Sequence, residues 1–203
     1  MHAITESTEA PEPTHSHHAG KARLRKPTPE DGFALNQLVA ASPPLDPNSV
    51  YCNLLQCTHF SDTAIAAEAD GELVGFVSGY IPPNKPTTLF VWQIVIAKSM
   101  RGQGLAKQML SQLLRDLAGK IRFIETTITP DNQASWNLFR SLARDLDTPL
   151  ESRVFYARDR HFGGRHDDER VRSAEFEQPV DDVEDVRAAV ESCPVMALKL
   201  VEA

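Results

Sequence analysis

Apolar and polar positions in the first third of the chain predict a short strand followed by two helices. Alternation at residues 22–26 is typical of a strand. The threonine, proline and two acids at 28–31 predict a helix start with the threonine as its cap. The expected apolar side of this helix is Phe33, Ala34, Leu38, Val39 and Ala41. A second helix is predicted over 45–59, with Tyr51, Leu54 and Leu55 at helical spacing.

The pattern then changes to strands separated by two further helices. Residues 88–96 form the most apolar run of the chain, which is typical of a central strand covered on both faces. An Asp70-Gly71 pair predicts a hairpin turn. Other strands are expected at 63–69, 73–81, 121–127, 152–157 and 169–176. Helices are expected at about 104–118 and from 131–132 onward, the latter with Ala134, Leu138 and Leu142 inward.

The predicted order is β-α-α-β-β-β-α-β-α-β-β. The helix between Ile94 and Ile121 favours a right-handed crossover joining two parallel strands. We therefore expect an α/β fold, a mixed twisted sheet with helices on both faces, over residues 21–177. Residues 1–20 are polar and aperiodic, which predicts a disordered leader. Residues 178–203 form an extension of unknown role, equally compatible with an edge strand or a partner-binding tail.

The net charge of −7 is unevenly distributed. Residues 21–166 hold 14 acids and 17 bases, a net of +3, so the excess acid lies in the two ends. This balance argues against nucleic-acid binding as a main task, but it is compatible with a polyanionic ligand. No run of about 18 apolar residues or signal peptide is present, so we expect a cytoplasmic protein with no membrane contact.

Cysteine and histidine contents point away from disulfides and metals. Three cysteines, an odd number, do not suggest a secreted disulfide scaffold, and Cys52 and Cys57 are expected to be inert packing residues. Four histidines fall in residues 1–20, where a metal tract is the alternative to a flexible tail. We expect no metal site, because a disordered segment fixes no coordination geometry.

Arg101-Gly102-Gln103-Gly104-Leu105-Ala106 lies between the most apolar strand and a helix. Two glycines allow the backbone to approach a ligand, the helix start supplies unpaired N–H groups, and the arginine adds charge. These features predict a pyrophosphate site. The dinucleotide fingerprint is excluded, because Lys107 stands where its third glycine would be, and no P-loop is present.

This hexad, in this position, resembles the Arg/Gln-x-x-Gly-x-Gly/Ala motif of the GCN5-related N-acetyltransferase (GNAT) superfamily, and the likeness extends over residues 21–177. It implies the GNAT acyl-CoA N-acyltransferase fold with acetyl-CoA as cosubstrate. The implied acetyl-CoA contacts are Ile94, Val95, Ile96, Arg101, Gly102, Gln103, Gly104, Leu105, Ala106, Asn132 and Ser135. Many members carry a tyrosine seven or eight residues after the asparagine as general acid, but here those positions are Phe139 and Arg140.

Several blocks more closely resemble the diaminobutyrate acetyltransferases of ectoine biosynthesis. They are residues 45–51, 54–60, 91–94, 132–136, 154–156 and 161–169, all in the same order. The resemblance implies transfer of an acetyl group to the γ-amine of L-2,4-diaminobutyrate in a ternary complex, by a homodimer. The alternatives are an acetyltransferase for another small amine or a protein N-terminus, and a non-catalytic acetyl-CoA sensor.

A diamine substrate requires acids to hold an ammonium group and gains from an aromatic wall. Asp46, Asn48, Trp92, His166 and Glu169 are the expected substrate contacts. The alternative readings are a helix cap for Asp46, ordinary core for Trp92 and a solvated acid for Glu169; His59 is expected to be structural. The attacking amine must lose a proton, and Glu169, His166 and Asp46 are candidate bases that the sequence does not rank.

Overall fold

The computed structural model describes residues 22–175. The predicted leader, the extension and the metal-tract alternative at its histidines lie outside these residues. The strands are β1 (Arg23–Arg25), β2 (Ile65–Ala69), β3 (Glu72–Tyr80), β4 (Thr88–Ile96), β5 (Phe123–Ile128), β6 (Glu151–Tyr156) and β7 (Glu169–Glu175). The helices are α1 (Asp31–Ala40), α2 (Val50–Thr58), α3 (Leu105–Asp116), α4 (Gln133–Asp145) and the single turn α5 (Arg158–His161).

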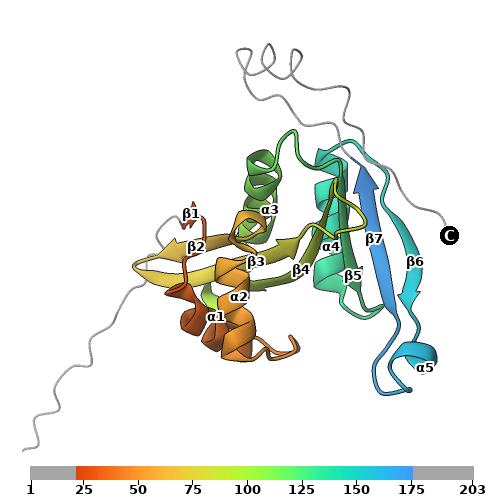
Figure 1. The fold of residues 1–203 in the computed structure, drawn as a ribbon, viewed down its shortest axis with the longest axis horizontal. Helices are drawn as coiled ribbons and strands as arrows, with labels where there is room; N and C mark the ends of the chain where they lie inside the picture. Colours follow the sequence, from red (N-terminus) through yellow and green to blue (C-terminus); the bar gives the residue numbers. More distant parts are fainter. Residues whose placement is uncertain (1–21, 176–203) are drawn as a thin grey trace, which may run out of the picture.

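The strands form one sheet in the order β1-β2-β3-β4-β5-β7-β6 (Figure 1). Only β4 and β5 are parallel among these neighbours, and α3 connects them. The predicted element order is therefore confirmed, apart from short 3-10 turns and α5. The Asp70-Gly71 turn has positive φ at both residues, as a two-residue hairpin requires. No helix within residues 22–175 is long and apolar enough to cross a membrane.

Helices cover both faces of the sheet, as predicted. On one face, α3 and α4 pack on alternate positions of β2 to β5, including Val77, Leu89 and Ile124. On the other, Leu35 and Val39 of α1 and Cys57 of α2 pack on Ala66, Phe76 and Val95. Because α1 and α2 cover only the β2–β4 side, the same face of β5, β7 and β6 is left without a helix (Figure 1).

The predicted apolar sides of the first two helices are partly wrong. Phe33 is 60% exposed and Tyr51 is 70% exposed. Polar Asn53 and Gln56 are buried instead and hydrogen-bond each other at 3.0 Å. The α1 and α2 backbones approach so closely that a Cβ on Gly32 would lie 2.5 Å from Leu54 Cδ2. This tight packing places paired amides between the helices and turns the large apolar residues outward.

Two further expectations are corrected. The threonine at 28 does not cap α1 with its side chain; the buried Asp31 accepts its N–H at 2.7 Å and is held by Arg25. In α4, Leu138 and Leu142 pack inward as predicted, but Ala134 is exposed, because it lies in the first turn after the N-cap Asn132. Trp136, Phe139 and Ala143 are also buried.

The strand β4 is central, but its second half pairs with a neighbouring strand along one edge only. It pairs with β5 only from Thr88 to Val91, and the two strands part beyond that point. The β3–β4 register shifts at the same level, between Ser78 and Gly79, which leaves Trp92 as the extra residue of a bulge. Trp92 is consequently 45% exposed rather than part of the core.

Candidate active site

The open edge of β4 presents backbone groups that pair with no strand within residues 22–175. The amide of Ala97 donates to the Val74 oxygen on β3 at 2.8 Å. In an antiparallel ladder every second residue points to the same neighbour, so Val95 also faces β3. Ile94 and Ile96 must then face the opposite side, where β5 has parted from β4. The backbone groups of Ile94 and Ile96 therefore face the gap, whereas those of Val95 face β3. Val95 as a whole is only 2% exposed.

The glycine-containing loop and the start of α3 lie at the end of this open edge. Gly102 and Gly104 have φ of +76° and +75°, a conformation that disfavours other residues. Gly104 is the N-cap of α3 and leaves the first helical amides, including those of Leu105 and Ala106, facing outward. Arg101 Nε donates to the Ile96 oxygen at 3.0 Å, which fixes a cation beside the loop. Gln103 donates to the Ser99 oxygen at 3.0 Å.

A second helix N-terminus flanks the same gap. The side chain of Asn132 accepts the N–H of Ser135 at 3.1 Å and begins α4. Because β4 and β5 are parallel, α3 and α4 both begin beyond the carboxyl ends of these strands. The predicted acetyl-CoA residues therefore surround one opening, except for Val95.

On the face not covered by α3 and α4, the loop before α2 is anchored to β4. Asn48 Nδ2 donates to Gln93 Oε1 at 2.9 Å, and Gln93 Nε2 lies 3.4 Å from the Asp46 oxygen. Asn36 of α1 donates to the Asn48 oxygen at 2.8 Å. Asn48 therefore positions the loop that carries the exposed Asp46 beside Trp92.

Predicted substrate residues from two parts of the chain lie near one another: His166 and Glu169 lie beside the start of β7, and Asp46 is near enough to act electrostatically on Glu169. His166 Nε2 lies 3.7 Å from Glu169 Oε1, and His166 Nδ1 lies 2.8 Å from the Asp167 oxygen. Burial raises the pKa of Glu169, and the nearby Asp46 carboxylate raises it further; the Thr127 hydroxyl and His166 act in the opposite direction. Two carboxylates and an imidazole thus share one site.

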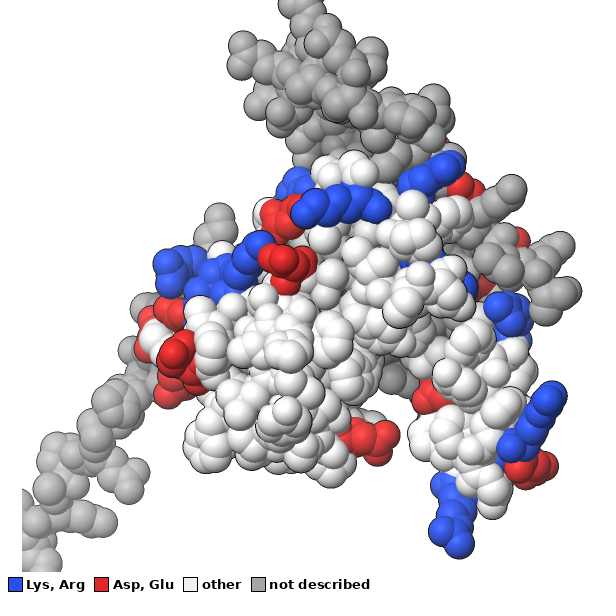
Figure 2. Space-filling view, in the orientation of Figure 1, with Lys and Arg blue, Asp and Glu red and all other residues white. Residues whose placement is uncertain are grey.

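Aromatic rings line the side of the site formed by β3 and β4. The rings of Trp92 and Tyr80 meet edge to face with their centroids 6.4 Å apart. The centroids of the Tyr80 and Phe90 rings are 5.2 Å apart. Figure 2 shows the molecule notched between the part with α1 and α2 and the part with β6, β7 and α5. The sequence did not identify Tyr80, Gln93 or Thr127 as members of this site. For Thr127 a signal was available, since it alternates with the core residue Ile128 on β5.

Cysteine, histidine and metal sites outside this group of residues offer no further chemistry among the described residues. Burial raises the pKa of the Cys57 thiol to about 12, which opposes any nucleophilic role. His59 is exposed at the end of α2. Among the described residues no cluster of three histidines, cysteines or acids could hold a metal ion.

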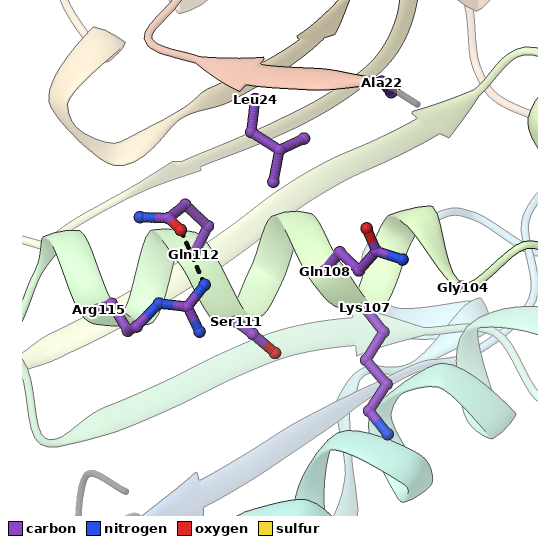
Figure 3. Close-up of a pocket in the computed structure, with 8 residues that line it drawn as sticks. All are labelled: Ala22, Leu24, Gly104, Lys107, Gln108, Ser111, Gln112 and Arg115. Atoms are coloured by element: carbon purple, nitrogen blue, oxygen red, sulfur yellow. Dashed lines mark hydrogen bonds between the residues drawn. The ribbon is translucent and has the colours of Figure 1, made fainter. Parts of the chain in front are cut away.

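A groove of about 590 Å³ runs along α3 beneath β1 (Figure 3). Ala22 and Leu24 form one wall, and Gln108, Ser111 and Gln112 lie opposite. Lys107 points away from β1 toward α4, where it pairs with Ser141 and Asp145 (Figure 3). The groove touches the predicted acetyl-CoA loop, residues 101–106, only at Gly104, and none of the predicted substrate residues lines it.

Sequence comparisons agree with this geometry. The model of the Acetyltransferase (GNAT) family matches residues 34–143. An L-2,4-diaminobutyric acid acetyltransferase from Methylotuvimicrobium alcaliphilum is 54% identical over 149 residues, covering 73% of this chain and 87% of that protein. The enzyme of the same name from Halomonas elongata is 46% identical over 157 residues, covering 76% of this chain and 81% of its own.

Structural comparisons give the same result. The diaminobutyrate acetyltransferase of Paenibacillus lautus, solved in complex with L-2,4-diaminobutyric acid and coenzyme A, superposes with a TM-score of 0.72 at 37% identity. The match covers 80% of this chain and 98% of that one. A GNAT acetyltransferase from Streptococcus pneumoniae, 16% identical with a TM-score of 0.59, shares the fold. The chain belongs to the GNAT family and, within it, to the L-2,4-diaminobutyric acid acetyltransferases.

Proposed function

We propose that this chain acetylates the γ-amine of L-2,4-diaminobutyrate with acetyl-CoA, giving N4-acetyl-L-2,4-diaminobutyrate for ectoine biosynthesis. The observation that carries the proposal is the convergence of Asp46, His166 and Glu169 beside the open edge of β4. The convergence occurs in a chain whose relatives are named for this reaction.

The residues around the gap fit acetyl-CoA. The outward amides at the start of α3 and the arginine beside them suit a pyrophosphate. The backbone groups of Ile94 and the amide of Ile96 face the gap and can pair with the amides of the pantetheine arm as a missing strand would; the Ile96 oxygen already accepts from Arg101. Acetyl-CoA would supply an activated thioester, and the chain would hold it against the amine.

The acidic cluster fits a diamine. Asp46 and Glu169 can hold an ammonium group and orient it, and the exposed Trp92 adds a π face. The amine must be neutral to attack, and a carboxylate of raised pKa accepts a proton near neutral pH more readily than an ordinary one. Glu169 is therefore the preferred base, with His166 Nε2 beside it as a proton acceptor for relay. His166 Nδ1 must carry a proton, since it faces a carbonyl oxygen.

The position at which many GNAT members have a tyrosine acid holds Phe139, whose side chain is 4% exposed and packed in the core. Arg140, the next residue, extends over the Trp136 ring at 5.3 Å. Neither residue can act as a phenolic acid. We infer that protonation of the leaving thiolate uses water or another group.

The test measures acetyl-CoA turnover by the release of free thiol. The acceptors compared are L-2,4-diaminobutyrate, ornithine, lysine and an N-terminal peptide. We expect kcat/KM to be highest for diaminobutyrate, and NMR should show that the product is acetylated at the γ-nitrogen.

Asp46→Asn should raise the KM for diaminobutyrate about tenfold, the cost of one charge-assisted contact, while the KM for acetyl-CoA stays constant. His59→Ala is the matched control and should behave as wild type. Equal kcat/KM for all amines would refute the substrate, and binding without turnover would indicate a sensor.

A further inference from the structure

The substrate of the proposed reaction carries an α-carboxylate, for which the predicted substrate residues include no lysine or arginine. Asp46 and Glu169 are acids, and they would repel it. A carboxylate held out of water needs a cation or hydrogen-bond donors. A lysine on the same face of the sheet meets this requirement.

Lys85 lies in the loop between β3 and β4, and its side chain reaches the face of β5. Its Nζ is 2.8 Å from both Oε1 and Oε2 of Glu125. The side chain of Glu125 is 6% exposed, whereas that of Lys85 is 34% exposed. An ammonium group has three donors and the carboxylate occupies two, so one donor remains available on the exposed side.

The ion pair lies on the substrate side of the sheet. Ile124 and Ile128 pack under α3 and α4, so Glu125 and Thr127, at the alternate positions, face the other way. Thr127 interacts with Glu169, and Glu125 lies one step further down the same strand face, about 7 Å away between Cα atoms. Tyr80, whose ring contacts Trp92, is also near Glu125. Burial raises the pKa of the Tyr80 phenol, and the charges of Tyr156 and Glu125 raise it further.

The site therefore differs at its two ends, with acids at one and the ammonium group of the Lys85–Glu125 ion pair at the other. Acids gather near the open edge of β4, where the amine must meet the thioester. The remaining N–H donor of the Lys85 ammonium group lies beside Glu125, toward the start of β5. In diaminobutyrate the γ-nitrogen and the carboxyl carbon are four bonds apart, about 5 Å. With a hydrogen bond of about 3 Å at each end, the molecule can extend along the β5 face from Glu169 toward Lys85.

We propose that Lys85, held by Glu125, binds the α-carboxylate of the substrate and thereby selects an amino acid over a diamine that lacks the carboxylate. This inference rests on the proposed function. Glu125 acts as a positioning residue: it is buried, and its two oxygens fix the direction of the ammonium group. The competing explanation is that the pair only secures the loop between β3 and β4.

The test compares L-2,4-diaminobutyrate with 1,3-diaminopropane, which has the same two amines and no carboxylate. In Lys85→Gln we expect the KM for diaminobutyrate to rise at least about tenfold, the loss of one charge-assisted hydrogen bond, while that for 1,3-diaminopropane changes less than about twofold. Lys85→Arg should restore most of the difference. Lys26→Gln, which breaks an exposed pair with Asp62, is the matched control and should alter neither.

Lys85→Gln leaves a buried carboxylate unpaired, so Lys85→Gln/Glu125→Gln is measured beside it, with thermal unfolding of each. The same selective loss in the folded double variant supports the proposal. An equal change of KM for both amines, or no change, overturns it and leaves the pair a structural contact. Wild-type protein that does not prefer diaminobutyrate to ornithine or lysine would instead overturn the proposed function.

Discussion

At the scale of the residue, the environment of Glu169 predicts the pH dependence of catalysis. Its pKa is raised from the ordinary 4.5 by burial and by Asp46. If Glu169 accepts the proton of the substrate, kcat/KM should fall as the pH drops through this raised pKa. Glu169→Gln should remove that acid limb together with most of the activity, about a hundredfold or more. A pH profile of wild type that follows an ordinary carboxyl would contradict the assignment.

The same shift predicts an effect on stability. An acid whose pKa is raised in the folded state stabilises the fold when protonated, and this contribution is lost as the pH rises through the folded pKa. At pH 7 the ionised Glu169 is therefore a cost, and Glu169→Gln should raise the free energy of unfolding. The gain should disappear below about pH 4, where unfolded carboxyls are protonated too. Urea unfolding at the two pH values measures the difference.

The sequence selects Asp46, His166 and Glu169 because their side chains can bind or move a proton near strand or helix ends. The structure places them near one another, and their roles stay predictions. For Trp92 the sequence left ordinary core as the alternative to a substrate contact, and the exposure of Trp92 at the bulge excludes that alternative. The Lys85–Glu125 ion pair could not be predicted from the sequence. The two residues are 40 positions apart, and only the folding of the sheet brings them into contact.

At the scale of the element, the start of α3 gives a test of the acetyl-CoA loop. Gly104 has φ of +75° and Gly119 has φ of +72°, but Gly119 lies beyond the other end of the same helix. A tryptophan at either position should lower stability by about 1–2 kcal/mol, because the conformation disfavours a Cβ. Neither position is sterically closed: the nearest atom to a Cβ on Gly104 is 3.8 Å away, and nothing lies within 4 Å at Gly119.

Only Gly104→Trp should weaken acetyl-CoA binding, by about a hundredfold or more, since its ring would occupy the approach to the helix amides. Calorimetric titration with acetyl-CoA measures this, and Gly119→Trp controls for the strain. If the two variants bind acetyl-CoA equally well, the loop is not the pyrophosphate site.

Element boundaries were partly predictable from local signals, although α2 begins at Val50 and not at the predicted 45. Ser49 caps α2 and Asn132 caps α4 through their side chains, and Asp70-Gly71 closes the hairpin. Helix faces were less predictable, because packing decides them. Asn53 becomes buried since Asn36 and Gln56 satisfy it, a condition that no periodicity reveals. The parting of β4 from β5 likewise depends on pairing between strands and could be inferred only through the family resemblance.

At the scale of the whole molecule, charge and function agree. The chain carries −7, whereas residues 21–166, which hold the acetyl-CoA loop, carry +3. A polyanionic cosubstrate therefore meets a mildly basic domain. The division into a leader, a domain and an extension stays a prediction, because residues 1–21 and 176–203 lie outside those described.

The homodimer expected from the family resemblance also stays a prediction, and the surface of α1 and α2 suggests where it forms. Phe33, Val50 and Tyr51 are 60%, 39% and 70% exposed, and Figure 2 shows few charged side chains over these helices. Exposed large apolar residues on two neighbouring helices can form part of an interface. Light scattering should give about twice the 22.5 kDa of one chain.

Phe33→Glu tests this location, because a charge buried in an interface is costly. We expect it to shift the mass toward one chain, or to raise the dimer dissociation constant about tenfold or more. Val154→Glu is the matched control: Val154 is also exposed, at 40%, but lies on β6 at the far edge of the sheet. Dissociation by Val154→Glu alone would move the interface to the β6 edge, and a wild-type mass of one chain would remove the dimer. Because Phe33 lies on α1, whose Asn36 holds the loop carrying Asp46, dissociation should also raise the KM for diaminobutyrate more than that for acetyl-CoA.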